Sequence, residues 1–279
     1  MENIKIINKK LIDKGWSYDE KYEVTSEDSI KYLLRVSSIE NLEDKIEEFN
    51  CMKKIEETGI NMCKPIEISK DENFVYTIIS WIDGVDAEEK MAKLSNEKQY
   101  EYGVEAGKTL QKIHSIPVEK TFDWEEYFSK KMERKINSYL ECSEKYENGD
   151  RFIQYINENK KLLKNRPISI HHGDFHIGNM MIGNDEKLYI IDFEKFDKGD
   201  PWEEFNRIVW SIKDFEHFSR GMIDGYFNNE IPEEFWKLMK LYISSNELGS
   251  LPWAISYGEQ QINVMKNKAK YVLEWLDKI

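Results

Sequence analysis

The chain has 279 residues, of which 40% are hydrophobic and 33% charged, as in a globular protein of one large or two modest domains. Its formal net charge of −13 argues against a nucleic-acid partner and favours cationic ligands, although solubility alone would also explain the charge. The three cysteines show no paired spacing, the N-terminus shows no export signal, and no apolar run is long enough to span a membrane. We therefore expect a cytoplasmic protein without a membrane partner.

Residues 1 to about 80 are predicted to be rich in strands. Short β-rich runs alternate with polar turns, and the third run ends at the turn signal Asp83-Gly84. Residues 40–57 instead predict a helix, because apolar side chains recur there at steps of three and four. The expected strands are 21–24, 31–36 and 74–81.

From residue 84 onward, helical periodicity dominates, with helices expected at 100–114, 124–140 and 152–163. A further helix is expected to open at Asp200, which would be its N-cap, followed by Pro201 and then Glu203. The pattern predicts an α+β protein of two lobes: a sheet-rich lobe at 1–82, and a mainly helical lobe at 83–279. Residues 84–89 are the candidate hinge.

The most informative motif is His172-Gly173-Asp174 followed by Asn179 and then, thirteen positions later, by Asp192. Two apolar runs separated by a polar turn lie between Asn179 and Asp192, which predicts a hairpin with a polar residue at each end. The hairpin should bring Asn179 and Asp192 side by side, and amide and carboxylate oxygens suit Mg²⁺. Asp174 could then accept a proton from a substrate hydroxyl, as in phosphoryl transfer.

These residues occur within a longer series of motifs that resembles the aminoglycoside phosphotransferases. That family has a protein-kinase-like fold and is related to choline kinases and other small-molecule kinases. The resemblance spans nearly the whole chain, and the 172–192 motif is its most specific part. The other matching segments, in order, are Gly15-Trp16-Ser17, Leu34-Arg35, Glu48, Asp83-Gly84 and Gly199-Asp200-Pro201.

The resemblance implies roles for individual residues. Asp174 is similar to the catalytic base, Asn179 and Asp192 to the Mg²⁺ ligands, and His172 to the histidine that braces the catalytic loop. Arg35 stands where the family usually has a lysine, although choline kinases resemble this chain in having an arginine there. Glu48 resembles its ion-pair partner. The nucleotide, ATP or GTP, would further contact Ser17 through its phosphates and the backbones of Ser80 and Ile82 through its base.

The acceptor is expected to be a small hydroxyl compound held by the helical lobe. By the resemblance, an aminoglycoside leads, while choline-like amines, sugars and homoserine stay open. Carboxylates would hold a cationic acceptor, and we expect Glu194, Glu203 and Glu204 to contribute. A monomer is expected.

Other interpretations of the same residues stay open. Arg35 could pair with any nearby acid, Asp200 fits a helix cap better than a functional residue, and His114 fits packing. A non-catalytic nucleotide-binding protein would share the fold, but intact Asp174, Asn179 and Asp192 argue against it. A zinc hydrolase could use His171, His172 and His176, but zinc does not account for the hairpin.

Overall fold

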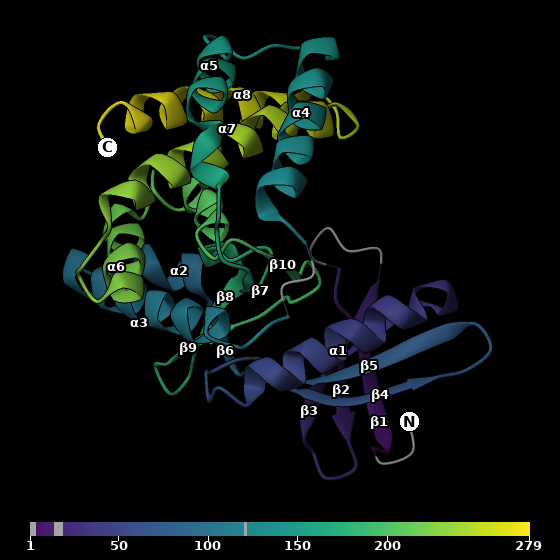
Figure 1. Ribbon diagram of the computed structural model, residues 1–279. Coiled ribbons are helices and arrows are strands. Elements are labelled where there is room, and N and C mark those ends of the chain that lie inside the picture. Colours follow the sequence, from purple (N-terminus) through teal and green to yellow (C-terminus); the bar gives the residue numbers. More distant parts are fainter. Residues whose placement is uncertain (1–3, 14–18, 120–121) are drawn as a thin grey trace. The chain divides into compact units, whose positions relative to one another are not determined.

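The computed structural model describes residues 4–13, 19–119 and 122–279, which form two compact units (Figure 1). Unit 1 comprises Met1–Lys93 and Gly178–Phe196, and unit 2 comprises Leu94–Ile177 and Asp197–Ile279. Unit 1 holds most of the strands and unit 2 most of the helices, so the predicted α+β class is confirmed. No helix in the described ranges combines the length and apolarity needed to cross a membrane.

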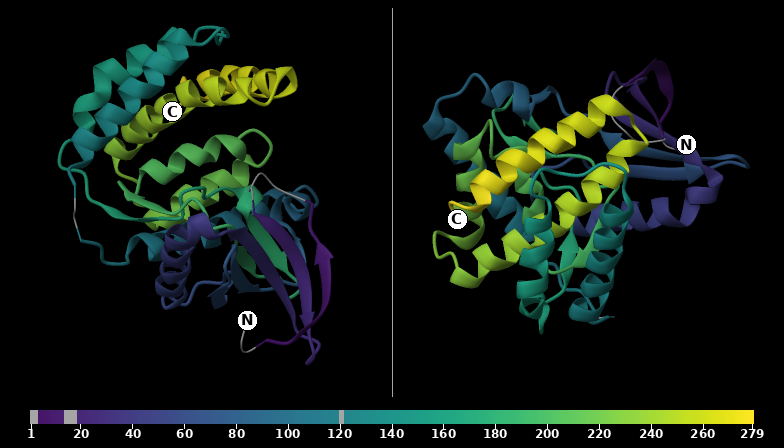
Figure 2. Two further views of the ribbon diagram at one scale, coloured as in Figure 1. Left: turned by 90° about the vertical axis from the view of Figure 1, so that its right-hand side faces the viewer. Right: turned by 90° about the horizontal axis from the view of Figure 1, so that it is seen from above.

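Unit 1 is built on a five-stranded antiparallel sheet with the strand order β1-β2-β3-β5-β4 (Figures 1 and 2). The three strands predicted from alternating and β-branched residues are present. Two more were missed, because β1 is almost entirely exposed and β4 begins with a proline, so neither shows a strong apolar pattern. The strands are β1 Ile6–Leu11, β2 Glu20–Ser26, β3 Lys31–Ser38, β4 Pro65–Lys70 and β5 Phe74–Ser80.

Helix α1, Leu42–Glu56, lies within the predicted range 40–57. Its buried side chains Phe49, Met52 and Ile55 follow the expected spacing of three and four residues. The same spacing carries Lys45 and Glu48 into buried positions, one turn apart. This helix therefore brings two charged side chains toward the interior of unit 1.

The predicted hairpin is present as β8, Met180–Gly183, and β9, Leu188–Ile190. It belongs to unit 1, because β8 also pairs with β6, Gly84–Asp86, and β9 is hydrogen-bonded to residues 61–63. Gly84 is required there, since a Cβ atom would lie 2.3 Å from the Ile182 carbonyl oxygen. This grouping differs from the predicted boundary at 82/83, and the expected hinge 84–89 forms β6 and the start of α2, Ala87–Met91.

Unit 2 consists mainly of helices, among which α3, Asn96–His114, and α6, Glu216–Phe227, pack backbone to backbone. A Cβ atom at Gly103 or Gly107 would lie 2.1 Å from a carbonyl oxygen of α6, so only glycine allows this approach. The remaining helices of unit 2 are α4 Trp124–Glu141, α5 Asp150–Asn159, α7 Glu233–Ile255 and α8 Glu259–Leu276, with a 3-10 turn at Lys160–Leu163. Two further 3-10 turns are Ile39–Asn41 in unit 1 and Ile177–Asn179, where the chain passes from unit 2 into unit 1.

The helix expected to open at Asp200 requires correction. It is a 3-10 helix, Glu203–Trp210, whose N-cap is Trp202. Asp200 does accept a hydrogen bond from the Trp202 amide (3.0 Å), but its fully buried carboxylate also binds Arg166 (2.6 Å) and the Tyr242 hydroxyl (2.6 Å). Asp200 thus fixes the segment that joins β10, Asp197–Gly199, to this 3-10 helix. Strand β10 pairs with β7, Ser169–His171.

Candidate active site

The hairpin brings Asn179 and Asp192 together. Met180 is opposite Ile190 in the antiparallel register, and the Ile191 amide donates to the Asn179 carbonyl at 3.0 Å, so Asp192 follows the partner of Asn179 directly. Asp192 has a positive φ of 65°, a backbone conformation that non-glycine residues adopt at a cost. This left-handed conformation comes two residues after the end of β9 at Ile190.

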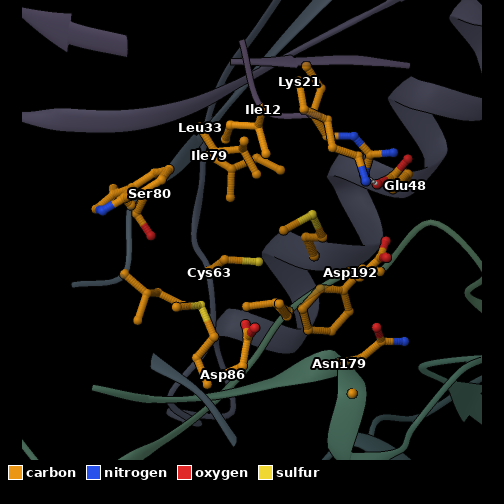
Figure 3. A pocket seen from close by; sticks show the side chains of 18 residues that line it. Ile12, Lys21, Leu33, Glu48, Cys63, Ile79, Ser80, Asp86, Asn179 and Asp192 are labelled. Carbon is orange, nitrogen blue, oxygen red and sulfur yellow. Dashed lines mark hydrogen bonds and ion pairs between the residues drawn. The ribbon is translucent and has the colours of Figure 1, made fainter. Parts of the chain in front are cut away.

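A pocket of about 310 Å³ lies within unit 1 and is lined mostly by apolar side chains. Figure 3 shows Lys21, Glu48, Asp192 and Asn179 along one side of it and Ser80 on the other. An apolar pocket with most of its charged side chains along one side suits a ligand with an apolar part and a charged part. The apolar lining includes Ile12, Leu33, Met52, Ile79, Met181 and Phe193.

The donor atoms in this pocket fit a hard divalent cation only in part. Asn179 and Asp192 supply amide and carboxylate oxygens, which Mg²⁺ accepts together with water and phosphate oxygens. Among the described residues, no three His, Cys, Asp or Glu side chains are grouped as a metal site. A cation held by Asn179 and Asp192 would therefore depend on further oxygens from a ligand and from water.

Arg35 is the centre of a buried ion-pair cluster in unit 1. The predicted pair with Glu48 is present at 3.2 Å, and Arg35 also contacts Asp19 (2.8 Å) and Glu194 (2.8 Å). Lys45 binds the same acids, at 2.9 Å to Asp19 and 3.1 Å to Glu48. Burial alone would lower the pKa of Arg35, but the charges of Glu48, Glu194 and Asp19 raise it above its ordinary value.

In the segment Ser80–Ile82, which is predicted to bind the base, the Ser80 amide already has a hydrogen-bond acceptor. The Ser80 amide donates to the Lys64 carbonyl, and the Ser80 hydroxyl accepts from the Lys64 amide, both at 2.8 Å. Ser80 could therefore offer its carbonyl to a base but not its amide, whereas Ile82 lines the pocket beyond the strand. Ser17 lies outside the described residues.

In unit 2, the loop that carries Asp174 presents a half-exposed carboxylate. The Arg207 Nε atom lies 3.0 Å from Asp174 Oδ1, and His176 Nε2 lies 3.7 Å from the same oxygen. Burial would raise the pKa of Asp174, but hydrogen bonding to His176 and the charge of Arg207 hold it well below its usual value. Asp174 is therefore ionised at neutral pH, as a group that accepts a proton must be.

The same loop is held from beneath by Glu204, which is 2% exposed. Its two carboxylate oxygens accept hydrogen bonds from the amides of His172 and Gly173, each at 2.8 Å, and Oε2 lies 3.1 Å from His114 Nε2. Burial would raise the pKa of Glu204, but the hydrogen bond to His114 and the charge of His171 lower it to about 2. His172 is fully buried, and its Nδ1 accepts from the Asp174 amide at 3.3 Å, which agrees with a bracing role.

The three histidines considered as zinc ligands are engaged in other contacts. His171 uses both ring nitrogens, with Nδ1 at 2.8 Å from Asp197 and Nε2 at 2.9 Å from the Asp200 carbonyl. His172 and His176 both contact Asp174 or its amide. A zinc site here would require these hydrogen bonds to break, so the arrangement disfavours the hydrolase interpretation.

Two of the three carboxylates expected to bind the acceptor, Glu194 and Glu204, already bind other groups of the protein. Glu194 is in unit 1 and pairs with Arg35 and Lys45, because it directly follows the hairpin that packs there. Glu204 is buried beneath the loop that carries Asp174 and cannot meet a ligand without breaking that support. Glu203 lies in unit 2 and is partly accessible, with a carboxylate oxygen 3.5 Å from Lys131 Nζ.

Sequence reasoning missed Asp19, Lys45, Lys21 and Arg207. Of the first two, only Lys45 could have been found, since the helical period of α1 places Lys45 one turn before Glu48. Lys21 could have been found from hairpin register, because the short turn after β2 sets Lys21 opposite Arg35. Nothing in the sequence pairs Arg207 with Asp174, which are joined by tertiary packing.

Solved structures with the same fold are numerous and distant in sequence. The amicoumacin kinase hAmiN, in complex with AMP-PNP, Ca²⁺ and Ami, is 16% identical with a TM-score of 0.67, over 93% of this chain and 86% of that one. A provisionally named fructosamine-3-kinase from Haemophilus somnus 129PT is 14% identical with a TM-score of 0.68, over 97% and 92%. The aminoglycoside phosphotransferase APH(4)-Ia is 12% identical with a TM-score of 0.71, over 97% and 94%.

A curated relative, the UPF0548 protein of Dictyostelium discoideum, is 28% identical over 103 residues. The match covers 31% of this chain and about half, 48%, of that protein, so it carries no functional statement.

The sheet-rich and helical units, together with the solved structures that share them, define a kinase-like phosphotransferase fold. The model of a family described as "Phosphotransferase enzyme family" matches residues 10–236, well over half of the sequence. The chain belongs to this phosphotransferase family.

Proposed function

We propose that this protein transfers the γ-phosphoryl group of ATP or GTP to a hydroxyl of a small molecule, with Mg²⁺ as the metal. The observation that carries the proposal is the hairpin register, which joins an amide and a carboxylate at the polar end of an apolar pocket. Asn179 and Asp192 would hold the ion, which when bound neutralises phosphate charge. Family membership and the AMP-PNP complex of hAmiN support the nucleotide.

Within this proposal, each remaining residue has a physical task. Ser80 and Ile82 would meet the base through backbone groups. Arg35 with Glu48 would form the wall at the phosphate end, and Ser17 would donate a hydrogen bond to a phosphate. Asp174 would orient the acceptor hydroxyl and take its proton, and His172 would hold the loop through the Asp174 amide.

The acceptor class stays part of the proposal. The names of related structures and the net charge of −13 support a cationic acceptor such as an aminoglycoside, with Glu203 as the carboxylate at hand. Choline-like amines, sugars and homoserine are alternative acceptors, and the structure named as a fructosamine-3-kinase supports the sugars among them. The three cysteines are free thiols, which supports a reducing, cytoplasmic location for an enzyme that we propose acts as a monomer.

The test is a panel of aminoglycosides, choline, sugars and homoserine, followed by release of ADP or GDP. We expect at least one acceptor to stimulate nucleotide turnover in the presence of Mg²⁺. Asp192→Ala should remove both this turnover and the Mg²⁺-dependent thermal stabilisation by nucleotide, because one metal ligand is lost. Failure of the purified protein to bind ADP or GDP with Mg²⁺ would contradict the proposal.

A further inference from the structure

Arg35 is poorly placed to give new hydrogen bonds to a phosphate. All three of its guanidinium nitrogens contact carboxylates: Nε and Nη2 contact Asp19, Nη1 contacts Glu48, and Nη2 contacts Glu194. The side chain is only 4% exposed. Its donors serve to hold three acidic side chains, from the segment before β2, helix α1 and the end of the hairpin.

The net charge of this cluster also argues against phosphate binding by Arg35. Two cations, Arg35 and Lys45, face three carboxylates, Asp19, Glu48 and Glu194. The balance is one negative charge, so the cluster by itself does not attract an anion. A nucleotide polyphosphate in the adjacent pocket would need a cation that is not already neutralised.

Lys21 meets this requirement. It is directly opposite Arg35 in the antiparallel pairing of β2 with β3, so the two side chains lie on the same face of the sheet. It lines the pocket, at the side where Glu48, Asp192 and Asn179 also lie (Figure 3). Within the described ranges, its ammonium has no ion-pair or hydrogen-bond partner.

We infer that Lys21 of β2, and not Arg35 of β3, is the cation that binds the nucleotide phosphates. Arg35 is a positioning residue, which fixes Glu48, Asp19 and Glu194 and thereby the wall behind the phosphates. A lysine on the neighbouring strand suits the first task, because its flexible stem can follow a phosphate. A rigid guanidinium fork suits the second, because it can hold several carboxylates at once. This inference rests on the proposed nucleotide site.

The experiment compares the affinities of ADP and adenosine, each with Mg²⁺, for purified variants by calorimetry. Lys21→Met should weaken ADP about 10- to 100-fold, because one charge-assisted contact is lost, and should leave adenosine within about twofold. Lys21→Arg should retain most of the ADP affinity. Lys70→Met, at the exposed end of β4 in the same sheet, is the matched control and should behave as wild type.

Arg35→Lys should lower the melting temperature, since several carboxylates lose the fork that holds them, yet keep ADP affinity within about threefold. The assignment is overturned if Lys21→Met binds ADP as wild type does, or weakens adenosine and ADP equally. It is also overturned if Arg35→Lys abolishes ADP binding at an unchanged melting temperature. A wild-type protein that binds no ADP would instead contradict the proposed function itself.

Discussion

At the scale of single residues, the site depends on how each charge is compensated. Asp174 is ionised because Arg207 and His176 stabilise its charge more than burial opposes it. Glu204 is ionised because two amides and His114 bind it. Asp174 is in the loop and Glu204 is in the 3-10 helix Glu203–Trp210 that supports it, and of the two only Asp174 is accessible enough to meet a substrate.

Asp174→Asn should reduce kcat by about 100-fold or more once an acceptor is known, because an amide cannot take the hydroxyl proton. Nucleotide affinity should stay within about twofold, since Asp174 does not line the pocket of unit 1. Steady-state kinetics and ADP calorimetry check the two parts. A variant with near-normal kcat would remove Asp174 from its proposed role.

Glu204→Gln should destabilise the protein by about 2–4 kcal/mol, because the amide group offers one acceptor where two backbone amides need acceptors. The catalytic loop should lose its geometry with it, so kcat should fall. Urea denaturation measures the first effect. Glu203→Gln, at the adjacent and more accessible position, is the control and should cost less than about 1 kcal/mol.

At the scale of elements, β7 and β10 are joined by a titratable contact. Burial would lower the pKa of His171, but Asp197 and Glu204 raise it to about 9. Its protonated form therefore favours the folded state. Against an ordinary value of 6.5, this corresponds to about 3 kcal/mol, fully present below pH 6.5 and lost as pH rises through about 9.

Urea denaturation between pH 6.5 and 9.5 should thus show a falling free energy of unfolding. His171→Asn cannot be protonated in this range, so its stability should be lower at pH 6.5 and should depend much less on pH above it. An equal alkaline decline in wild type and variant would show that other groups cause it.

The elements also show how far the sequence could be followed. The strands 21–24, 31–36 and 74–81, the helix 40–57 and the hairpin were predictable, because each carries its own apolar period or turn. Strands β1 and β4 were not, since exposed edge strands bury too few side chains to leave a pattern. Glu194 and Glu204 were assigned to the acceptor because carboxylates suit a cationic ligand, whereas the sequence does not show their ion-pair and hydrogen-bond partners.

At the scale of the whole molecule, the pocket that we propose for the nucleotide is formed by segments far apart in sequence but within one unit. Its lining comes from residues 12–86 and 178–193. The chain thus leaves unit 1 after β6 and α2, builds the first of the two segments of unit 2, and returns with the hairpin. A nucleotide bound in this pocket should therefore contact both sequence segments of unit 1 and stabilise their packing against each other.

Hydrogen exchange should show this directly. Addition of ADP and Mg²⁺ should slow amide exchange in β3, β5, β8 and β9, because opening of these strands would then have to release the ligand. Helices α4, α7 and α8 of unit 2 should change much less. Protection confined to unit 2 would place the nucleotide elsewhere.

The sequence by itself determined the phosphotransferase family, the pairing of Asn179 with Asp192, and the partnership of Arg35 with Glu48. The first pairing follows from a local rule, since a hairpin acts over a few residues, whereas the partnership of Arg35 with Glu48 follows from the family resemblance. The tertiary structure alone decided which charges are already neutralised: Arg35 by three carboxylates, Glu204 by the loop amides, and Asp174 by Arg207. Compensation of charge depends on side chains that meet across elements, and no local pattern records it.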